Sequence, residues 1–139
     1  MFCDIKDRLD DPVVHKILSH CVFENSPKGI EKAVNEYRQY ASRLFYGWIE
    51  NGELLGVCGF EVHSDYVEIR HISVDENTQR RGIGRSIVTA LREKYKVAIE
   101  AETDNDAVAF YRKTGFDTTA IRKYDVRRWV CRLPVPDGV

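Results

Sequence analysis

The sequence predicts an α/β (α+β) fold with the element order ααβββαβαββ, and three local patterns indicate it. Two helix-start signals stand early in the chain, at Asp11-Pro12 and Ser26-Pro27. The pair Asn51-Gly52 separates two strand-like runs, as in a type I′ hairpin. A glycine-containing turn then leads from a strand-like run into residues with a helical period. The chain has 139 residues, 43% of them hydrophobic, which is enough for a buried core. We therefore expect residues 1–139 to form a single domain.

The first half of the chain predicts two helices and a β meander. Apolar residues recur at the helical period after each of the two start signals. Strands are expected at 44–50 and 53–62, on either side of the hairpin turn, and at 66–74. Gly56 and Gly59 within the second strand indicate a bulge or a close approach of another backbone.

The second half predicts a helix, a strand, a short helix and a final hairpin. A helical stripe runs from Ile83 to Tyr95, and residues 96–101 form the next strand. Asp104 or Asn105 is expected to cap a short helix that runs through Thr114. Gly115 follows at the position where helices commonly end. The expected last strands are residues 116–121 and 126–133.

The turn from Gln79 to Ser86 is the strongest functional signal. Glycines at 82 and 84 let the backbone come close to a ligand, and the first free N–H groups of the helix point outward. The helix dipole favours an anion there by ~0.3–1 kcal/mol, and three arginines add positive charge. The turn therefore predicts a phosphate site. A tight connection between strand and helix would also explain the glycines, and the arginines could simply be charged residues in contact with solvent.

Two common nucleotide motifs are absent, and a third pattern is present. Ile87 stands where a dinucleotide fingerprint needs glycine, and no Gly-Lys-Ser/Thr occurs. The turn reads Gln-x-x-Gly-x-Gly, and Asn105, Ala107 and the run Phe110-Tyr111-Arg112-Lys113-Thr114-Gly115-Phe116 follow it. This combination resembles the GNAT superfamily of N-acetyltransferases, which bind acetyl-CoA. The resemblance covers essentially the whole chain and is tightest from Glu68 to Phe116.

The resemblance implies a mixed, mostly antiparallel sheet that is flanked by helices and splays between residues 66–74 and 96–101. The pantetheine arm of acetyl-CoA would lie in that cleft, and the pyrophosphate would sit on the amides of residues 81–86. The cofactor-binding residues implied in this way are Ile72, Val74, Gln79, Arg80, Arg81, Gly82, Ile83, Gly84, Arg85, Ser86, Asn105 and Tyr111.

Two of these residues have an alternative explanation. Asn105 is equally suited to cap a helix, a role that does not exclude contact with the cofactor. Tyr111 could be a core tyrosine with a satisfied hydroxyl. The family motif Phe-Tyr-x-x-x-Gly-Phe instead implies that the Tyr111 hydroxyl approaches the sulfur of the cofactor and acts as a catalytic acid.

Acetyl transfer also needs a base, because a protonated amine cannot attack a thioester. Glu68 stands eleven residues before Gln79, the spacing at which some GNAT enzymes that act on protein lysines carry a catalytic glutamate. It shares the alternation phase of Ile72 and Val74, and faces the cleft unless a bulge intervenes. A solvated glutamate paired with Arg70 is the alternative. His71 has a suitable pKa but the opposite phase, and water could also accept the proton.

Composition limits the partners. The 21 basic and 22 acidic residues give a net charge of −1, which gives no support for binding of nucleic acid or a membrane surface. The four cysteines form no C-x-x-C pair or zinc spacing, and no apolar run has the length of a membrane span. We expect no metal, a cytoplasmic location and a monomer or homodimer.

The expected function is transfer of the acetyl group of acetyl-CoA to a primary amine by direct attack. A small-molecule amine is the expected acceptor, and a protein lysine or N-terminus is an alternative. Another alternative is a module that binds acetyl-CoA as a sensor and has lost catalysis. No motif identifies the acceptor.

Overall fold

The computed structural model describes residues 1–22, 26–78 and 81–137. Gln79 and Arg80, which belong to the predicted phosphate turn, lie outside the described residues. The α-helices and strands are β1 (Phe2–Asp4), α1 (Pro12–Leu18), α2 (Pro27–Gln39), β2 (Arg43–Glu50), β3 (Glu53–Val62), β4 (Tyr66–Val74), α3 (Ile83–Tyr95), β5 (Ala98–Thr103), α4 (Val108–Lys113), β6 (Asp117–Lys123) and β7 (Val126–Leu133).

The strands form one mixed sheet in the order β1-β2-β3-β4-β5-β7-β6. Neighbouring strands are antiparallel except β4 and β5, which are parallel. This confirms the predicted α/β fold with a mostly antiparallel sheet. The sequence did not predict β1, which pairs Phe2 with Trp48 and Asp4 with Tyr46 at the edge of the sheet. A strand of three residues is too short to show an alternating pattern of apolar and polar side chains.

Local signals explain where most elements begin and end. The side chains of Asp11 and Ser26 cap α1 and α2, as predicted. Asn51 and Gly52 have φ of 53° and 77°, the two positive values that a type I′ hairpin requires. Strand β5 starts at Ala98 and not at residue 96, because Lys96 ends α3 in a left-handed conformation with φ of 55°.

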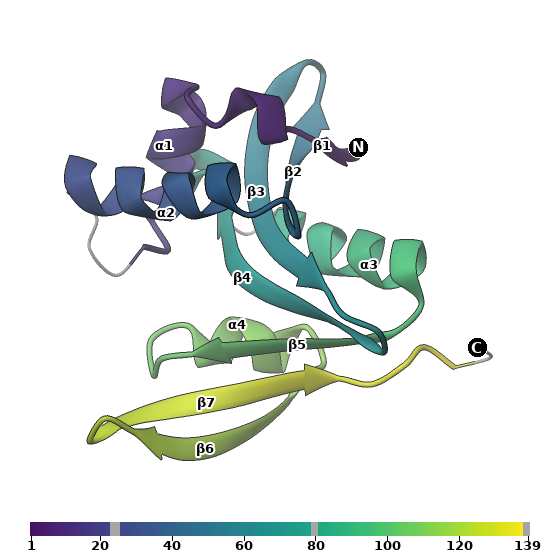
Figure 1. Ribbon diagram of the computed structural model, residues 1–139. Coiled ribbons are helices and arrows are strands. Elements are labelled where there is room, and N and C mark those ends of the chain that lie inside the picture. Colours follow the sequence, from purple (N-terminus) through teal and green to yellow (C-terminus); the bar gives the residue numbers. More distant parts are fainter. Residues whose placement is uncertain (23–25, 79–80, 138–139) are drawn as a thin grey trace.

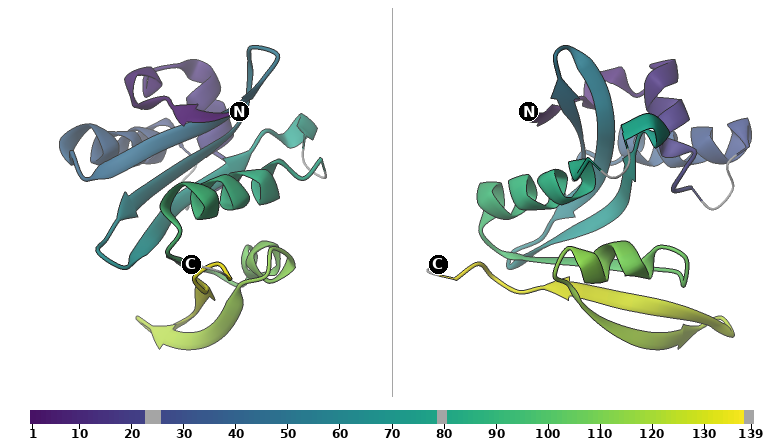
Figure 2. Two further views of the ribbon diagram at one scale, coloured as in Figure 1. Left: turned by 90° about the vertical axis from the view of Figure 1, so that its right-hand side faces the viewer. Right: turned by 180° about the vertical axis from the view of Figure 1, so that it is seen from behind.

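The helices cover both faces of the sheet (Figure 1). Helices α1 and α2 lie over β2, β3 and β4 on one face, and the view from behind shows α3 and α4 on the other (Figure 2). Each pair of helices covers its own apolar cluster. One cluster includes Val34, Tyr37 and Val57, and the other includes Ile87 and Tyr111. No described helix is long and apolar enough to span a membrane.

Candidate active site

The sheet opens between β4 and β5, and this opening is the centre of the candidate site. The two strands pair only from Tyr66 with Ala98 to Ile69 with Ala101. Beyond Ile69, β4 has no partner strand on this side within the described ranges, and it diverges from β5 (Figure 1). Backbone N–H and C=O groups need partners. The edge of β4 up to Val74 can therefore pair with an extended ligand.

A bulge interrupts β4 at the point where the two strands separate. On the β3 side, Gly59 pairs with His71 and Phe60 pairs with Ile69, so Arg70 is an extra residue. An extra residue exchanges the faces of all side chains that follow it. The bulge predicted at Gly59 is confirmed, with its extra residue in the partner strand β4. The close neighbour of Gly59 is the Tyr37 side chain and not another backbone. A Cβ atom on Gly59 would lie 1.8 Å from the hydroxyl oxygen of Tyr37.

The bulge overturns the predicted alternation of Glu68. Strict alternation put Glu68 on the face of Ile72 and Val74, with His71 opposite. In the structure, Ile72 and Val74 pack against the apolar cluster under α3 and α4. Glu68 and His71 line one cavity on the other face of the sheet, beside α2. The two candidate bases therefore share a site.

That cavity has a volume of about 460 Å³ and lies across the opening of the sheet. Helix α2 contributes Glu36, and β4 contributes the segment 68–71. The far wall consists of Glu102 from β5, Lys123 from β6 and Arg128 from β7. Six of the eight lining residues carry a formal charge, so the cavity suits a polar, charged ligand.

The Glu68 carboxylate is half-buried and has two partners. Its Oε1 lies 3.0 Å from His63 Nε2, and its Oε2 accepts a hydrogen bond of 3.1 Å from Arg70 Nη1. With 35% of the side chain exposed, the carboxylate can still contact a molecule in the cavity. The solvated pair with Arg70 and the basic role are thus compatible.

His71 is held by a buried tyrosine. The Tyr37 hydroxyl lies 2.6 Å from His71 Nδ1, within hydrogen-bond distance. Burial lowers the pKa of His71, and it raises the pKa of the Tyr37 hydroxyl. His71 is therefore neutral near pH 7 and contributes no charge to the cavity.

One group of side chains at this site has the composition of a metal site. Glu61, His63 and Glu68 each bring one ligand atom within 4.8 Å of the others. All three already have protein partners, since Glu61 accepts a 2.6 Å hydrogen bond from the Ser42 hydroxyl and Glu68 contacts His63 and Arg70. The sequence prediction of no metal stays a prediction.

The predicted phosphate turn leads into α3 as expected. Gly82 precedes the helix with φ of 76°, a conformation that favours glycine. The first N–H group bonded within the helix is that of Ser86, which donates to the Gly82 carbonyl at 2.9 Å. The N–H groups of residues 83–85 have no partner in the helix, because helix starts leave such donors free. Free N–H groups at a helix start can bind an anion.

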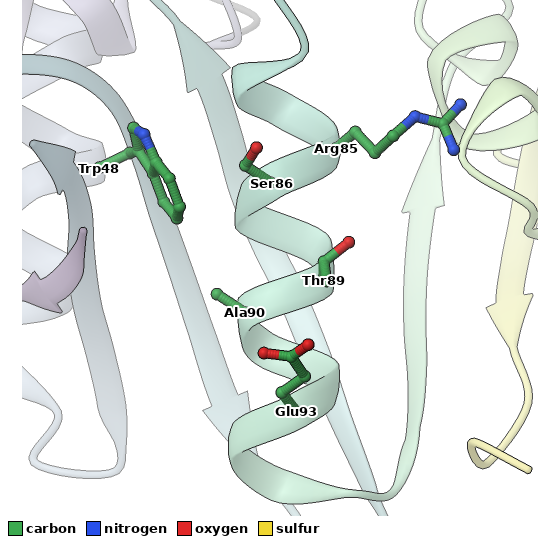
Figure 3. A pocket seen from close by; sticks show the side chains of 6 residues that line it. All are labelled: Trp48, Arg85, Ser86, Thr89, Ala90 and Glu93. Atoms are coloured by element: carbon green, nitrogen blue, oxygen red, sulfur yellow. The ribbon is translucent and has the colours of Figure 1, made fainter. Parts of the chain in front are cut away.

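Two arginines of this turn have protein partners. Arg81 pairs with Glu50 at 3.1 Å, and Glu50 also accepts a hydrogen bond from Trp48. Arg85 donates to the Lys113 carbonyl at the end of α4. Figure 3 shows Arg85 extending away from Trp48, with which it lines a shallow pocket of about 270 Å³ on the outer side of α3. That pocket lies outside the opening between β4 and β5.

Gly84 has a packing role that its motif did not reveal. A Cβ atom at this position would lie 2.6 Å from Phe110, so glycine is needed for the contact between α3 and α4. At Gly82 a Cβ atom would meet nothing within 4 Å. Gly82 is therefore a glycine because of its φ, and Gly84 because of packing.

Tyr111 and Asn105 lie beside the apolar cluster of α3 and α4. The Tyr111 ring packs edge-on against Phe110 and Phe116 with centroid distances of 5.2 Å. Burial raises the pKa of the Tyr111 hydroxyl, and no described residue forms a hydrogen bond with it. Asn105 Oδ1 accepts a hydrogen bond of 2.7 Å from Trp129.

The predicted cap of the short helix is wrong, because α4 begins only at Val108 and its N-cap residue is Ala107, which has no side-chain cap hydrogen bond. Asp104 Oδ1 instead accepts hydrogen bonds from the Asp106 and Ala107 amides at 3.0 and 2.9 Å, in the turn before the helix. The side-chain amide nitrogen of Asn105 makes no hydrogen bond to the described residues.

Sequence reasoning missed Lys123 and Arg128 on the far wall of the cavity. Both contact Glu102, at 3.3 and 3.2 Å. The pairing Ile121↔Arg128 together with Glu102↔Val130 brings these side chains to one face of the sheet. The register of the final hairpin is the signal that would have found them, and it does not follow from residue types alone.

Comparison with known proteins agrees with this geometry. The Acetyltransferase (GNAT) family profile matches residues 12–116. An uncharacterized N-acetyltransferase from the lysA 3′ region of Bacillus methanolicus is 35% identical over 80 residues, 57% of this chain and 67% of that protein. The UPF0157 protein YqkA of Bacillus subtilis is 32% identical over 84 residues, which cover 56% of this chain and 24% of YqkA.

Solved structures share the fold. The ribosomal-protein-S18-alanine N-acetyltransferase of Escherichia coli matches with a TM-score of 0.74 and 21% identity, over 100% of this chain and 97% of that one. An aminoglycoside 6′-N-acetyltransferase in complex with coenzyme A matches with a TM-score of 0.71 and 17% identity, over 99% of both chains. With the family profile spanning most of its length, this chain belongs to the GNAT acetyltransferase family.

Proposed function

We propose that the protein transfers the acetyl group of acetyl-CoA to a primary amine. The observation that carries this proposal is the free edge of β4, which lies beside the N-terminus of α3 and opens onto a charged cavity containing Glu68. An extended chain with a phosphate at one end and a reactive group at the other suits these three features. The GNAT structure that was solved with coenzyme A supports the choice of ligand.

Acetyl-CoA would be bound mainly by backbone groups. The pantetheine amides pair with the β4 edge around Ile72 and Val74, and the pyrophosphate lies on the N–H groups that begin α3. Residues 83–85 supply those groups, because the amides of Arg81 and Ser86 already donate to the Thr78 and Gly82 carbonyls. Gln79, Arg80 and Arg81 precede these residues in the sequence. Asn105 contributes its free amide nitrogen.

The reaction is a direct attack. The Glu68 carboxylate accepts one proton from the ammonium, the amine nitrogen then bonds to the thioester carbon, and the C–S bond breaks as the intermediate collapses. The nitrogen loses its second proton in this collapse, and that proton replaces the one taken up by the departing sulfur. Tyr111 donates a hydrogen bond or proton to the departing sulfur. Burial favours the neutral form of the Cys58 and Cys131 thiols, and it raises the pKa of Cys131 to about 11. Such thiols are poor nucleophiles, which supports transfer without an acetyl-cysteine.

His71 and water are the competing bases. The Nδ1 atom of His71 is within hydrogen-bond distance of Tyr37, and burial lowers its pKa. The lowered pKa removes part of the advantage that an imidazole has over a carboxylate as a proton acceptor. Glu68 is our choice because its half-buried carboxylate is open to the cavity, with 35% of the side chain exposed.

Two measurements on one preparation test the proposal. Acetyl-CoA at ~100 times its dissociation constant should stabilise the folded protein by about 2.7 kcal/mol in a thermal melt. Free thiol should appear when an amine from a broad panel is added, and excess EDTA should not change its rate. ATP serves as the control for a generic phosphate.

The outcomes separate the alternatives. A melting temperature that responds to acetyl-CoA without thiol release from any amine would support the sensor instead. A melting temperature indifferent to acetyl-CoA would contradict both functions. Release only with lysine peptides or protein N-termini would assign a protein acceptor.

A further inference from the structure

On the face of the sheet that carries the cavity, none of the described helices covers β5, β7 and β6. Figure 1 shows β5, β7 and β6 with this face open, and the view from behind shows α4 on their other face (Figure 2). Cross-strand pairs place Glu100 beside Arg132 and Ile121 beside Arg128. The open face is therefore charged where the opposite face is apolar.

The far wall of the cavity has an excess of positive charge. Lys123 and Arg128 share the single carboxylate of Glu102, at 3.3 and 3.2 Å. Among the described residues, two cations here therefore share one counter-charge. The neighbouring pair of Glu100 and Arg132, at 2.8 Å, balances itself and does not supply one. Lys123 is 46% exposed and Arg128 32%, so both can contact a ligand.

The near wall has an excess of negative charge. Glu36 and Glu68 face the cavity from α2 and β4, and Arg70 is the cation among the residues that line this wall. Arg43, which lies outside the cavity, pairs with Glu36 and neutralises its charge. Glu61, beside Glu68, adds a further negative charge, so the carboxylates at this wall still outnumber the cations. Hydrogen bonding to Ser42 lowers the pKa of Glu61, so it is ionised at neutral pH.

We propose that the acceptor is an amine that also carries an anionic group. Its carboxylate or phosphate binds Lys123 and Arg128, and its amine lies against Glu68 on the opposite wall. This inference rests on the proposed function and names its acceptor class. A polycationic amine would instead bring a second positive charge against the unbalanced cation, which disfavours it.

Matched acceptors test the anionic group directly. Phenylalanine is compared with phenethylamine, and phosphoethanolamine with ethanolamine, by thiol release and with rates corrected for the fraction of free amine. Spermidine and kanamycin represent polycations. At least one anionic member should have a kcat/KM about tenfold or more above its partner, the factor expected from one charge-assisted hydrogen bond. The pair that responds identifies carboxylate or phosphate.

Variants of the last hairpin assign the effect to residues. Arg128→Gln should reduce the preference for the anionic member about tenfold, mainly through KM, and Arg128→Lys should restore part of it. Arg127→Gln is the matched control, since Arg127 pairs across from Arg122 and lies on the other face of the hairpin. It removes the same charge and should leave the preference unchanged.

Three results would overturn the inference while leaving the enzyme intact. These are equal rates within both matched pairs, faster transfer to spermidine or kanamycin, and equal effects of Arg128→Gln and Arg127→Gln. Thiol release from no amine at all would remove the proposed function and this inference with it.

Discussion

The two faces of the splayed sheet differ in how they are built. On the face under α3 and α4, the opening is bordered by free backbone groups of β4 and by an apolar cluster that includes the buried Tyr111. On the face beside α2, it is bordered by ion pairs of Glu68 and Glu102. The first face suits a ligand that is bound through its backbone-like amides. The second suits a ligand that is bound through its charges.

This difference shows why a sequence motif can specify a cofactor site more readily than an acceptor site. Backbone binding requires particular residues only where a turn or a close contact demands them, as at Gly82 and Gly84. Recognition by charge draws on residues from four strands and a helix. A cofactor site can therefore be common to a family while its acceptor site varies.

The largest effect should come from the apolar face. Tyr111→Phe removes only a hydroxyl, and loss of general acid help should reduce turnover by about 10²–10⁴. Because burial raises the pKa of Tyr111, the hydroxyl stays protonated and the pH profile should keep its shape. Stopped-flow thiol release measures turnover across pH, and an acetyl-CoA titration measures cofactor binding, which should change far less. Tyr40→Phe, at an exposed tyrosine, is the control, and wild-type turnover in Tyr111→Phe would return Tyr111 to a packing role.

The second effect belongs to the charged face and should depend on pH. Glu68→Gln should reduce turnover on the order of 10²-fold at neutral pH. The rate should partly recover at higher pH, where more amine is free, while acetyl-CoA affinity stays near that of the wild type. A pH series of kcat/KM measures this. Glu53→Gln, at an exposed strand residue, is the control, and an unaffected rate would transfer the role to His71 or water.

The third effect distinguishes the two glycines of the turn. Gly84→Ala forces a methyl group against Phe110 and should destabilise the fold by about 1–3 kcal/mol. Gly82→Ala meets no neighbour but needs a positive φ, which should cost about 1 kcal/mol. Urea unfolding measures both. Equal stability of Gly84→Ala and wild type would show that α3 and α4 are less tightly packed than described.

The smallest effect concerns the neutral histidine of the charged face. The lowered pKa of His71 means that the unfolded chain binds a proton more readily than the folded one. Stability is therefore full above the ordinary pKa of 6.5 and is lost as the pH falls toward the folded pKa. The melting temperature of His71→Gln should depend less on pH just below 6.5 than that of wild type. His20→Gln should keep the wild-type slope, and identical slopes for all three would contradict the lowered pKa.

Local conformation explains what the sequence predicted well. Asn51-Gly52 and Gly115 adopt positive φ in short segments, and their residue types reveal it without any knowledge of the remaining fold. The family motif extended this to the order of the helices and strands and to the splayed sheet. Its residue roles remain predictions.

The features that were not predicted depend on residues distant in sequence. The bulge at Arg70 is defined only by pairing with β3, and it moved Glu68 to the face of His71. The need for glycine at 84 comes from Phe110, in another helix. Strand β1 exists because β2 offers it an edge. None of these partners can be read from a local pattern.

The short pairing of β4 with β5 also leaves the sheet incomplete. Ladder hydrogen bonds between these strands run only from Tyr66 to Ile69, and beyond them the two halves are held together by side chains, such as those of the cluster under α3 and α4. If an extended ligand pairs with the free edge, amide hydrogen exchange should slow at Ile72 and Val74 when it binds. In the proposed function, acetyl-CoA would then act as a removable eighth strand.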